Sequence, residues 1–467
     1  MSKPMTLFRK IKAIHFVGIG GSGMSGIAEV LLTYGYRVSG SDLKASEVTK
    51  RLENMGAKVC IGHEPAHIEG AEVVVVSSAI RADNPELIAA HYRNIPIIPR
   101  AEMLAELMRM KYGIAVAGAH GKTTTTSMLA HILEDTGMDP TVVIGGRLNR
   151  YDANAKAGQG ELMLAEADES DGSFMRLSPT IAIVTNLDEE HLDHYKGGMA
   201  EIEETFLAFM NKVPFYGMVV ACKDDPRLEQ LLPQVTRKLT TYGLKGDAHI
   251  SAADIRSKGF HTSYELMVRG GKYGQIELSV PGHHNVLNSL AAIAVGLEFD
   301  VPIATMTDSL KKFTGADRRF HLIGKARGRT LVDDYAHHPT EITATLQGAH
   351  AAWDKRIVAV FQPHRYTRFQ QCWDRFLNSF TMAGHVVVVP VFPAGEAPID
   401  GVDSKSFAAS LSQRHPSVSY LADVNNLPAH LMAKSEEGDL IMGLGAGNIG
   451  IICKMVHQHW SNGQKKG

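Results

Sequence analysis

Short apolar runs alternate with amphipathic stretches along almost the whole chain, and this alternation constrains the fold more than any other feature. Typical runs are "AIHFVGIG" at 13–20, "EVVVVSSA" at 72–79 and "GHVVVVP" at 384–390. Strands separated by helices favour parallel pairing, because a parallel connection must cross from one end of the sheet to the other. The pattern therefore predicts an α/β protein built on parallel sheets.

The 467 residues are too many for one ordinary core. A prior of about 150 residues per domain predicts about three domains. We divide the chain into blocks 1–110, 111–322 and 323–467, each with its own series of strand-like runs. Residues 261–282, in the second block, alternate polar and apolar side chains, which indicates an antiparallel part.

The charge balance excludes several classes of protein. The chain has 48 basic and 50 acidic residues, so it lacks the excess charge that attracts nucleic acids or anionic membrane surfaces. No apolar stretch reaches the ~20 residues of a membrane helix. Four separated cysteines without a CxxC pair indicate neither a disulfide framework nor a thiolate zinc site. We expect a cytoplasmic protein, monomer or homodimer, without nucleic-acid or membrane partners.

Two glycine-rich turns follow strand-like runs, and each of them can hold phosphate. The first turn reads Gly18-x-Gly20-x-x-Gly23, and Asp42 follows further along the chain. A strand, a glycine turn of this form and a helix are typical of dinucleotide binding, with the later acid on the ribose of NAD. Taken alone, the first turn favours an NAD-dependent oxidoreductase.

The second turn runs from Gly118 to Thr123 and reads GAHGKT. It misses the strict GxxxxGK[ST] pattern by one position, because Val116 stands where the first glycine belongs. Its other features suit a nucleoside triphosphate: backbone N–H groups can surround the phosphates, Lys122 can reach their β/γ oxygens, and the Thr123 hydroxyl can bind Mg²⁺. A plain strand–turn–helix junction is the alternative interpretation.

Polar side chains follow the next two strand-like runs of this block. They are Glu166, Asp168, Glu169 and Asp171 after one run, and Asn186, Asp188 and His191 after the next. The carboxyl ends of parallel strands gather at one edge, so we expect these side chains beside the second turn, where oxygen ligands suit Mg²⁺. Two alternatives stay open: most of the carboxylates belong to a solvated loop, or His191 and His194 form a zinc pair.

Further motifs give a specific resemblance. "PGHHNVLNSLAA", "GADRRF", "DDYAHHPTEI" and "FQPHRYTR" follow the second turn in this order. Together with that turn they resemble the Mur ligase family, ATP-dependent enzymes that form the amide bonds of the bacterial cell-wall peptide. The resemblance runs from about Ile14 to Asn448. It accounts for Val116, since the family's turn reads GTxGKT. Ala119 is the one departure from that turn, at a position that contributes mainly backbone.

Within the family, the chain is most similar to members that attach L-alanine to UDP-N-acetylmuramate. Residues 14–29 and 333–342 carry this narrower match. Several other members have a carbamylated lysine where this chain has Phe206. The alanine-adding members also lack that lysine, which supports the narrower match.

The resemblance implies three domains. Residues 1–110 would form a Rossmann-like domain for the UDP-sugar. Residues 111–322 would form a P-loop ATPase-type α/β domain with an antiparallel part. Residues 323–467 would form a second Rossmann-like domain that binds the amino acid and closes on ATP. The first glycine turn then holds a diphosphate that stays intact, and the second holds the triphosphate that is consumed. This context, and not the first turn itself, favours a UDP-sugar over NAD.

The implied reaction has two stages and uses ATP with Mg²⁺ or Mn²⁺. The N-acetylmuramate carboxylate attacks the γ-phosphate to give an acyl phosphate and ADP, and the amine of L-alanine then displaces phosphate. We assign catalysis to Lys122, Glu166, His191, Arg319 and His337, with His337 as a candidate base. We assign the ATP contacts to Gly118, Ala119, His120, Gly121, Lys122, Thr123, Thr124, Asn285, Asn288, Arg319 and Asp334, and the metal to Thr123, Glu166 and His191.

The expected substrate contacts fall into two groups. The UDP-sugar would meet Gly20, Gly21, Ser22, Gly23, His63, Ser77 and Ser78. L-Alanine would meet Tyr335, His337, Arg365 and Arg368, with Arg368 gripping its carboxylate as a planar fork. Ordinary loop polar groups, surface ion pairs and helix caps are the competing interpretations. Three other functions stay open: a ligase for a preformed tripeptide, an NAD-dependent oxidoreductase, and a nucleotide-binding regulator without catalysis.

Overall fold

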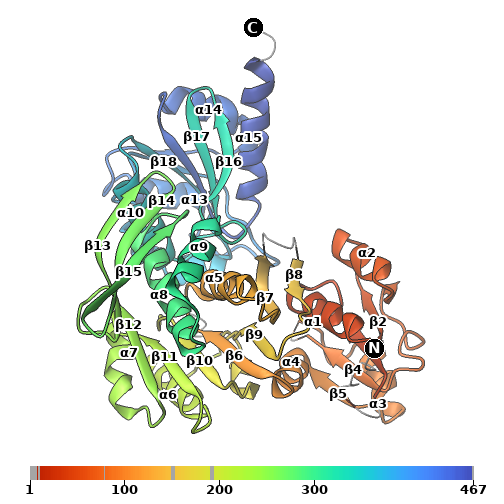
Figure 1. The fold of residues 1–467 in the computed structure, drawn as a ribbon. Coiled ribbons are helices and arrows are strands. Elements are labelled where there is room, and N and C mark those ends of the chain that lie inside the picture. Colours follow the sequence, from red (N-terminus) through yellow and green to blue (C-terminus); the bar gives the residue numbers. More distant parts are fainter. Residues whose placement is uncertain (1–7, 9–10, 78, 149–152, 190–193, 465–467) are drawn as a thin grey trace. The chain divides into compact units, whose positions relative to one another are not determined.

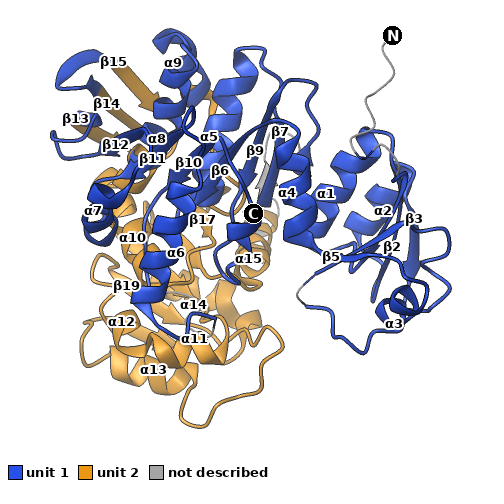
Figure 2. Cartoon of the chain, turned by 90° about the horizontal axis from the view of Figure 1, so that it is seen from below, with its two compact units in different colours: residues 1–253, 266–274, 287–310 blue, residues 254–265, 275–286, 311–467 orange. Residues whose placement is uncertain are grey.

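The computed structural model describes residue 8 and residues 11–77, 79–148, 153–189 and 194–464. In these residues the strands form three sheets with helices packed on them, which confirms the predicted α/β fold class (Figure 1). The chain divides into two compact units (Figure 2). Unit 1 comprises residues 1–253, 266–274 and 287–310, and unit 2 comprises residues 254–265, 275–286 and 311–467.

The N-terminal sheet has the strand order β3-β2-β1-β4-β5, and all of its neighbouring pairs are parallel. β1 is buried along its whole length because it is the central strand, and this explains its continuous apolar run. The strand order reverses between β1 and β4, and ligands of such sheets bind beyond the carboxyl ends of the strands at this point. The elements are β1 (Ala13–Val17), α1 (Ser22–Thr33), β2 (Arg37–Asp42), α2 (Glu47–Asn54), β3 (Lys58–Ile61), β4 (Val73–Val76), α3 (Pro85–Tyr92), β5 (Ile97–Pro99) and α4 (Arg100–Arg109).

The central sheet has the order β15-β14-β13-β12-β11-β10-β6-β9-β7-β8. β6 pairs in parallel with β9 and β10, so these three strands end at the same edge. α5 packs on β6, β7 and β9 (Figure 1). Two-residue connections join β13 to β14 and β14 to β15, and connections this short can join only antiparallel neighbours, as predicted.

The strands of this sheet are β6 (Tyr112–Ala117), β7 (Thr141–Leu148), β8 (Ala153–Lys156), β9 (Leu162–Glu166), β10 (Ile181–Val184), β11 (Met218–Cys222), β12 (Leu239–Gly243), β13 (Ile250–Lys258), β14 (His261–Val268) and β15 (Gly271–Leu278). The helices in this part of the chain are α5 (Lys122–Asp135), α6 (Met199–Asn211), α7 (Pro226–Leu231), α8 (His283–Glu298) and α9 (Ile303–Lys312). Short 3₁₀ helices span Ser173–Arg176 and Leu232–Gln234.

The C-terminal sheet has the order β16-β17-β21-β18-β19-β20. Its pairs are parallel except for the edge strand β16, which runs antiparallel to β17. β18 is buried on both faces: Ala359 and Phe361 belong to one apolar cluster, and Val358 and Val360 belong to another. A strand that is covered on both faces reads as a continuous apolar run, which is why β18 stands out in the sequence.

The elements of this part are β16 (His321–Ala326), β17 (Arg329–Asp334), α10 (Pro339–Ala352), β18 (Ile357–Phe361), α11 (Tyr366–Gln371), α12 (Trp373–Leu377), β19 (His385–Val388), α13 (Ser404–Leu411), β20 (Val418–Tyr420), α14 (Leu427–Lys434), β21 (Leu440–Leu444) and α15 (Ile449–Gln464). A 3₁₀ helix spans Val424–Asn426.

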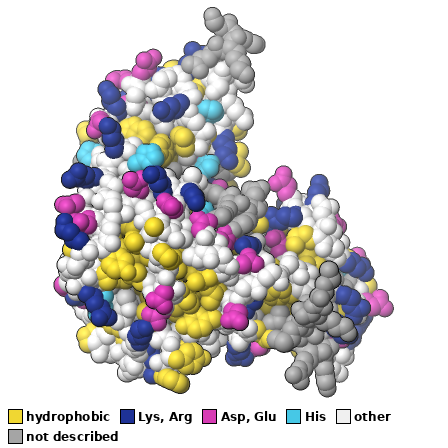
Figure 3. All heavy atoms as spheres, viewed as in Figure 1, with side chains coloured by type: hydrophobic (Ala, Val, Ile, Leu, Met, Phe, Trp, Pro, Cys, Tyr) yellow, Lys and Arg dark blue, Asp and Glu magenta, His cyan; other side chains and the backbone are white. Residues whose placement is uncertain are grey.

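Among the described residues, no helix combines the length and the apolar character that crossing a membrane requires. The face drawn in Figure 3 carries acidic and basic side chains side by side. This mixture agrees with the nearly balanced charge of the whole sequence.

Candidate active site

The second glycine turn connects β6 to α5, and its backbone requires glycine. Gly118 and Gly121 have φ angles of 128° and 84°, in the region that side chains disfavour. A Cβ on Gly121 would lie 2.6 Å from Oδ1 of Asn288, and one on Gly118 would lie 2.1 Å from Oγ1 of Thr185. Asn288 and Thr185 therefore pack tightly against the turn. The turn places the positive end of α5 at the edge of the sheet.

Lys122, the first residue of α5, folds back over this turn. Its Nζ donates to the carbonyls of Gly118 at 2.5 Å and Ala119 at 3.0 Å, and it lies 2.8 Å from a carboxylate oxygen of Glu169. Burial opposes the charge of Lys122, but the Glu169 and Glu166 carboxylates raise its pKa. The ammonium group is thus held charged inside the turn.

Glu169 is buried, so the alternative that places the acidic run in a solvated loop is wrong for this residue. Its side chain is only 7% exposed and pairs with Lys122. Burial raises the pKa of Glu169 to about 7, although the Lys122 ammonium opposes this shift. The backbone carbonyl of Glu169 also accepts a hydrogen bond from the Tyr195 hydroxyl at 2.6 Å. Glu169 therefore belongs to the site, and sequence reasoning did not assign it a role.

Thr123 and Glu166, the two predicted metal ligands that the structure describes, lie side by side. The Thr123 hydroxyl is 3.0 Å from one Glu166 oxygen and 3.1 Å from the other, and the Gly145 N–H donates to the same carboxylate at 2.9 Å. A hydroxyl and a carboxylate at a phosphate turn are oxygen ligands that suit a hard divalent cation. His191, the third predicted ligand, lies outside the described residues.

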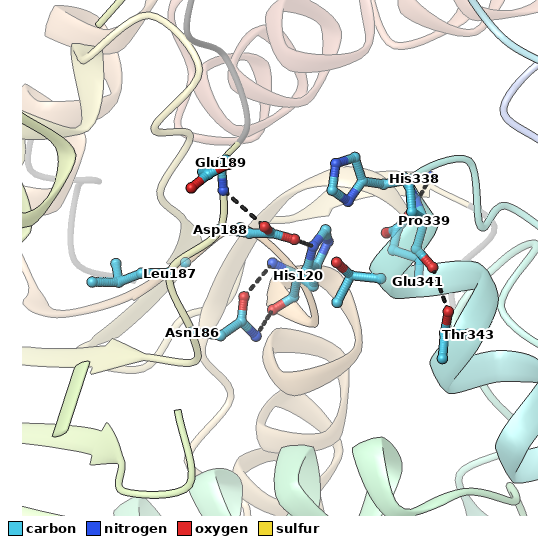
Figure 4. A network of polar contacts seen from close by, with 12 residues as sticks. His120, Asn186, Leu187, Asp188, Glu189, His338, Pro339, Glu341 and Thr343 are labelled. Carbon is cyan, nitrogen blue, oxygen red and sulfur yellow. Dashed lines mark hydrogen bonds and ion pairs between the residues drawn. The ribbon is translucent and has the colours of Figure 1, made fainter. Parts of the chain in front are cut away.

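The end of β10 clamps the turn from its other side (Figure 4). Asn186 accepts from the backbone N–H of His120 at 2.8 Å and donates to the His120 carbonyl at 3.0 Å. The His120 ring lies 2.9 Å from Asp188.

Among the other predicted nucleotide contacts, Asn288 accepts from the Thr125 hydroxyl, while Asn285 donates to the carbonyl of Pro281. Thr124 is buried in the first turn of α5.

The first glycine turn connects β1 to α1. Gly18 has a φ of 83°, and Oδ2 of Asp42 accepts a hydrogen bond from the Gly20 N–H at 2.9 Å. A Cβ on Gly23 would lie 2.9 Å from Nη1 of Arg100, so this guanidinium lies against the turn. Arg100 also lies 3.7 Å from a carboxylate oxygen of Asp168. Sequence reasoning missed Arg100, because it comes from α4, far along the chain.

The remaining predicted UDP-sugar contacts lie near the same edge. Ser77 follows β4, and its hydroxyl would be 3.8 Å from a Cβ on Gly18. His63 follows β3 and is hydrogen-bonded to Ser41 at 3.0 Å. The side chain of Ser22, at the start of α1, and the whole of Ser78 lie outside the described residues. Gly21 is the residue before α1.

Arg319 and Asp334, which are also assigned to the nucleotide, lie in unit 2 and are both engaged with neighbours. Arg319 donates to Glu341 at 3.0 Å, and its guanidinium lies 5.3 Å from the centre of the Tyr335 ring. The Asp334 carboxylate accepts from the backbone N–H groups of Phe320 and Ala336. Burial raises the pKa of Asp334 to about 6, against the effect of Arg319.

The residues assigned to L-alanine cluster after β17 and β18. The ring centres of Tyr335 and His337 are 5.1 Å apart, and those of His337 and His364 are 5.9 Å apart. Nη1 of Arg368 lies 3.3 Å from Nδ1 of His364. Burial and the nearby His337 lower the pKa of His364 to about 4, so its ring is neutral at neutral pH.

The two arginines of this group have different environments. Arg365 donates to Glu396 at 2.6 Å, which matches the ion-pair interpretation that competed with an alanine contact. Arg368 faces His364 instead. In the same region α10 begins at Pro339, directly after His338 (Figure 4). Glu341 accepts a hydrogen bond from the His337 N–H at 3.0 Å. Glu341 therefore fixes the backbone that presents the His337 ring.

Comparison with known proteins gives the class to which these turns belong. The chain matches a model described as "Mur ligase family, catalytic domain" over residues 13–112 and one described as "Mur ligase middle domain" over residues 116–296. It matches "Mur ligase, glutamate ligase domain" over residues 318–447. The chain belongs to the Mur ligase family, and the resemblance seen in its motifs is confirmed.

Individual relatives are more specific. A protein of Geotalea daltonii named UDP-N-acetylmuramate--L-alanine ligase is 54% identical over 95% of this chain and 97% of its own. One of the same name from Myxococcus xanthus is 50% identical over 96% of this chain and 95% of its own. Among solved structures, the UDP-N-acetylmuramate-alanine ligase of Thermotoga maritima has a TM-score of 0.81 at 28% identity, covering 97% of this chain and 99% of that one. A murein peptide ligase of Psychrobacter arcticus has a TM-score of 0.67 at 26% identity, with 97% and 98% coverage.

Proposed function

We propose that the protein joins L-alanine to the carboxylate of UDP-N-acetylmuramate, with conversion of ATP to ADP and phosphate, in peptidoglycan precursor synthesis. It is an ATP-dependent amide-bond-forming ligase. The observation that carries the reaction type is the second glycine turn, where Lys122 and the Thr123–Glu166 pair meet at one edge of the sheet. Near full-length identity to alanine-adding ligases supports the choice of substrates.

The chemistry divides into two balanced steps. One oxygen of the sugar carboxylate bonds to the γ-phosphorus while the bond from phosphorus to ADP breaks. The alanine nitrogen then attacks the acyl carbon, phosphate leaves with that oxygen, and the nitrogen releases a proton. Lys122 would exchange Glu169 for the β/γ oxygens of ATP and stabilise charge that grows there. His337 remains the proposed acceptor of the alanine proton, because its ring lies beside the proposed alanine residues.

Thr123 and Glu166 fit a divalent cation, and we propose that they hold Mg²⁺ or Mn²⁺ together with His191. Such an ion would offset the repulsion between the sugar carboxylate and the phosphates. Unlike a zinc site, this pair offers only oxygen ligands among the described residues. Protein loaded with Mg²⁺ should lose activity in EDTA and regain it when Mg²⁺ is restored.

The first glycine turn is proposed to hold the diphosphate of the UDP-sugar through Gly20, Gly21, Ser22 and Gly23, with Arg100 as an added cation. Ser77, Ser78 and His63 would contact the nucleotide beyond the turn. Asp42, which the NAD alternative needs for a ribose, accepts a hydrogen bond from the turn's own backbone. That hydrogen bond leaves the carboxylate able to accept others, and it is the near full-length similarity to UDP-N-acetylmuramate ligases that favours the UDP-sugar over NAD.

For the amino acid, the structure favours Arg368 over Arg365 as the carboxylate ligand. Arg365 is neutralised by Glu396, whereas Arg368 lies beside the neutral ring of His364. Tyr335 and His337 would border the alanine methyl group. Arg319 and Asp334 stay proposed as nucleotide contacts of the C-terminal part.

One assay tests the reaction. ADP release from full-length protein should require UDP-N-acetylmuramate and rise sharply when L-alanine is added. With ¹⁸O in the muramate carboxylate, one label should appear in the released phosphate. Unlabelled phosphate would exclude the acyl phosphate, and ADP release that ignores L-alanine would exclude the proposed substrate.

The murein peptide ligase similarity defines the second candidate, a ligase for a preformed tripeptide. The two functions share the sugar and the nucleotide, so amino-acid competition separates them. L-Alanine should be consumed at micromolar to millimolar concentration, as is typical of enzyme substrates. Turnover with the tripeptide that exceeds turnover with L-alanine would favour the second candidate. The cytoplasm is the proposed location, because that is where ATP and a UDP-sugar are both supplied.

A further inference from the structure

A buried carboxylate lies under the carboxyl edge of the N-terminal sheet, and the proposed reaction gives it no role. Glu86 is the second residue of α3, and its side chain is fully buried. Groups from three other segments surround it: His15 of β1, Ser41 of β2, and His63 and His67 from the loop after β3. One carboxylate therefore connects most of the segments that form this edge.

The groups around the carboxylate are hydrogen-bond donors. Oε2 accepts from the Ser41 hydroxyl at 2.6 Å and lies 3.3 Å from Nε2 of His15. Oε1 lies 2.8 Å from Nδ1 of His67 and 3.4 Å from the backbone N of Glu64. Burial alone would raise the pKa of Glu86, but the hydrogen bonds from His15, Ser41 and His67 lower it to about 2. The positive end of α3 acts in the same direction. Glu86 is therefore anionic at neutral pH and can only accept.

Because Glu86 can only accept, it fixes the direction of the hydrogen bonds made by Ser41 and His63. A serine hydroxyl has one proton, and Ser41 gives it to Glu86, so its oxygen must accept from its other neighbour. That neighbour is Nδ1 of His63 at 3.0 Å, which must therefore carry a proton. In a neutral imidazole the other nitrogen, Nε2, is then an acceptor. Glu86 thus selects one of the two tautomers of His63.

His63 stands where a nucleoside is expected. It follows β3, which is two strands away from β1 and its glycine turn, a lateral distance of about 10 Å. A nucleoside attached to a diphosphate at that turn can reach this far along the edge. The His63 side chain is 12% exposed, so it is held by the network and still reaches the surface.

We propose that Glu86 is a positioning residue that acts through Ser41 to make Nε2 of His63 an acceptor for a hydrogen bond from the uridine. The donor is the imide N–H of uracil or the 2′-hydroxyl of the ribose. The proposal rests on the proposed function, because it takes a uridine nucleotide as the ligand of this edge. With the imide as the donor, the proposal also predicts base selectivity. Cytosine presents a lone pair where uracil presents the N–H, so the fixed Nε2 lone pair would repel it.

Binding of UDP, CDP and 2′-deoxy-UDP to the full chain tests the proposal. If the imide is the donor, the wild type should bind CDP at least ~10-fold more weakly than UDP; if the ribose is the donor, 2′-deoxy-UDP should be weaker by a similar factor. In Glu86→Gln and Ser41→Ala, that ratio should fall to about two-fold, because His63 can then take either tautomer. His67→Ala is the matched control: it removes a neighbour of Glu86 but leaves the relay, and should keep the wild-type ratio.

Histidine ¹⁵N NMR of the ligand-free protein tests the relay without any ligand. His63 should be protonated at Nδ1 in the wild type and should show both tautomers in the two relay variants. If Glu86→Gln fails to fold, Ser41→Ala carries the same prediction. An unchanged ratio in both variants, equal binding of all three nucleotides by the wild type, or a proton on Nε2 would each overturn the proposal. Failure of UDP to bind at all would reject the uridine assignment and the UDP-sugar function together, while the NMR result would still decide the relay.

Discussion

At the scale of single residues, the site holds its charged groups in place before any substrate arrives. Lys122 is paired with Glu169 and with two carbonyls of its own turn, so its ammonium group is desolvated and oriented. Preorganised charge of this kind stabilises a transition state more than a mobile side chain can. Arg368 and His364 form a comparable arrangement after β18.

Replacing Lys122 by Ala should lower turnover by at least ~10³-fold, because it removes a charge that acts on the transferred phosphoryl group. The side chain is 13% exposed, so folding should be checked by circular dichroism. Steady-state ADP release is the measurement. Glu169→Gln is the companion variant: it keeps Lys122 but removes its partner and should reduce turnover less. Near-normal turnover of Lys122→Ala would contradict the assignment of this turn to ATP.

Arg368→Lys should raise the KM for L-alanine by at least ~10-fold and leave the KM for ATP within about two-fold, because lysine cannot form the paired hydrogen bonds of a guanidinium. Arg365→Lys is the matched control. Arg365 is paired with Glu396, so its substitution should change the alanine KM less. An equal increase in the KM for L-alanine in both variants would contradict the assignment of Arg368, and not Arg365, as the ligand of the alanine carboxylate.

At the scale of the elements, each strand–turn–helix could be predicted from sequence, whereas the contacts between elements could not. The buried runs β1, β6 and β18 are visible because strands covered on both faces are continuously apolar. The pairing of Lys122 with Glu169, and the approach of Arg100 to the first turn, join residues far apart in the chain, and no local pattern encodes them. For the same reason the acidic run gave no sign that Glu169 alone is buried.

Gly121→Ala should disrupt the second turn more than its backbone strain alone can explain. A left-handed alanine costs about 1–2 kcal/mol, and its Cβ would also lie 2.6 Å from Oδ1 of Asn288. Gly137→Ala is the control, since Gly137 has a similar φ of 78° with no atom within 4 Å of a Cβ. Calorimetric binding of ADP should weaken at least ~10-fold in the first variant and stay unchanged in the second. Normal ADP binding by both variants would mean that the Asn288 side chain moves away from the added Cβ.

At the scale of the whole molecule, the proposed chemistry draws on residues of both units. Lys122, Thr123 and Asn288 belong to unit 1, while Asn285, Arg319 and Asp334 belong to unit 2. α8 carries both asparagines, so one continuous helix contributes to each unit. The proposed assignments therefore predict that turnover is lost when either unit is unfolded.

The N-terminal sheet should lose stability in acid because of Glu86. Its pKa in the folded protein, about 2, is below the ordinary value of 4.5. The ionised form is therefore favoured by folding, and its contribution is present above pH 4.5 and is lost as the pH falls towards 2. At pH 5, Glu86→Gln should be less stable than the wild type, and this difference should shrink between pH 5 and pH 3.

Hydrogen exchange in urea, followed in peptides that cover β1 and β4, would report this sheet separately from the rest of the chain. Glu53→Gln is the control, because Glu53 is exposed on α2, an element that supplies none of the groups named around Glu86. The control should match the wild type at both pH values. The contrary result is a difference in stability between wild type and Glu86→Gln that stays constant from pH 5 to pH 3. That result would show that the shape of the Glu86 side chain stabilises the sheet and that its negative charge does not.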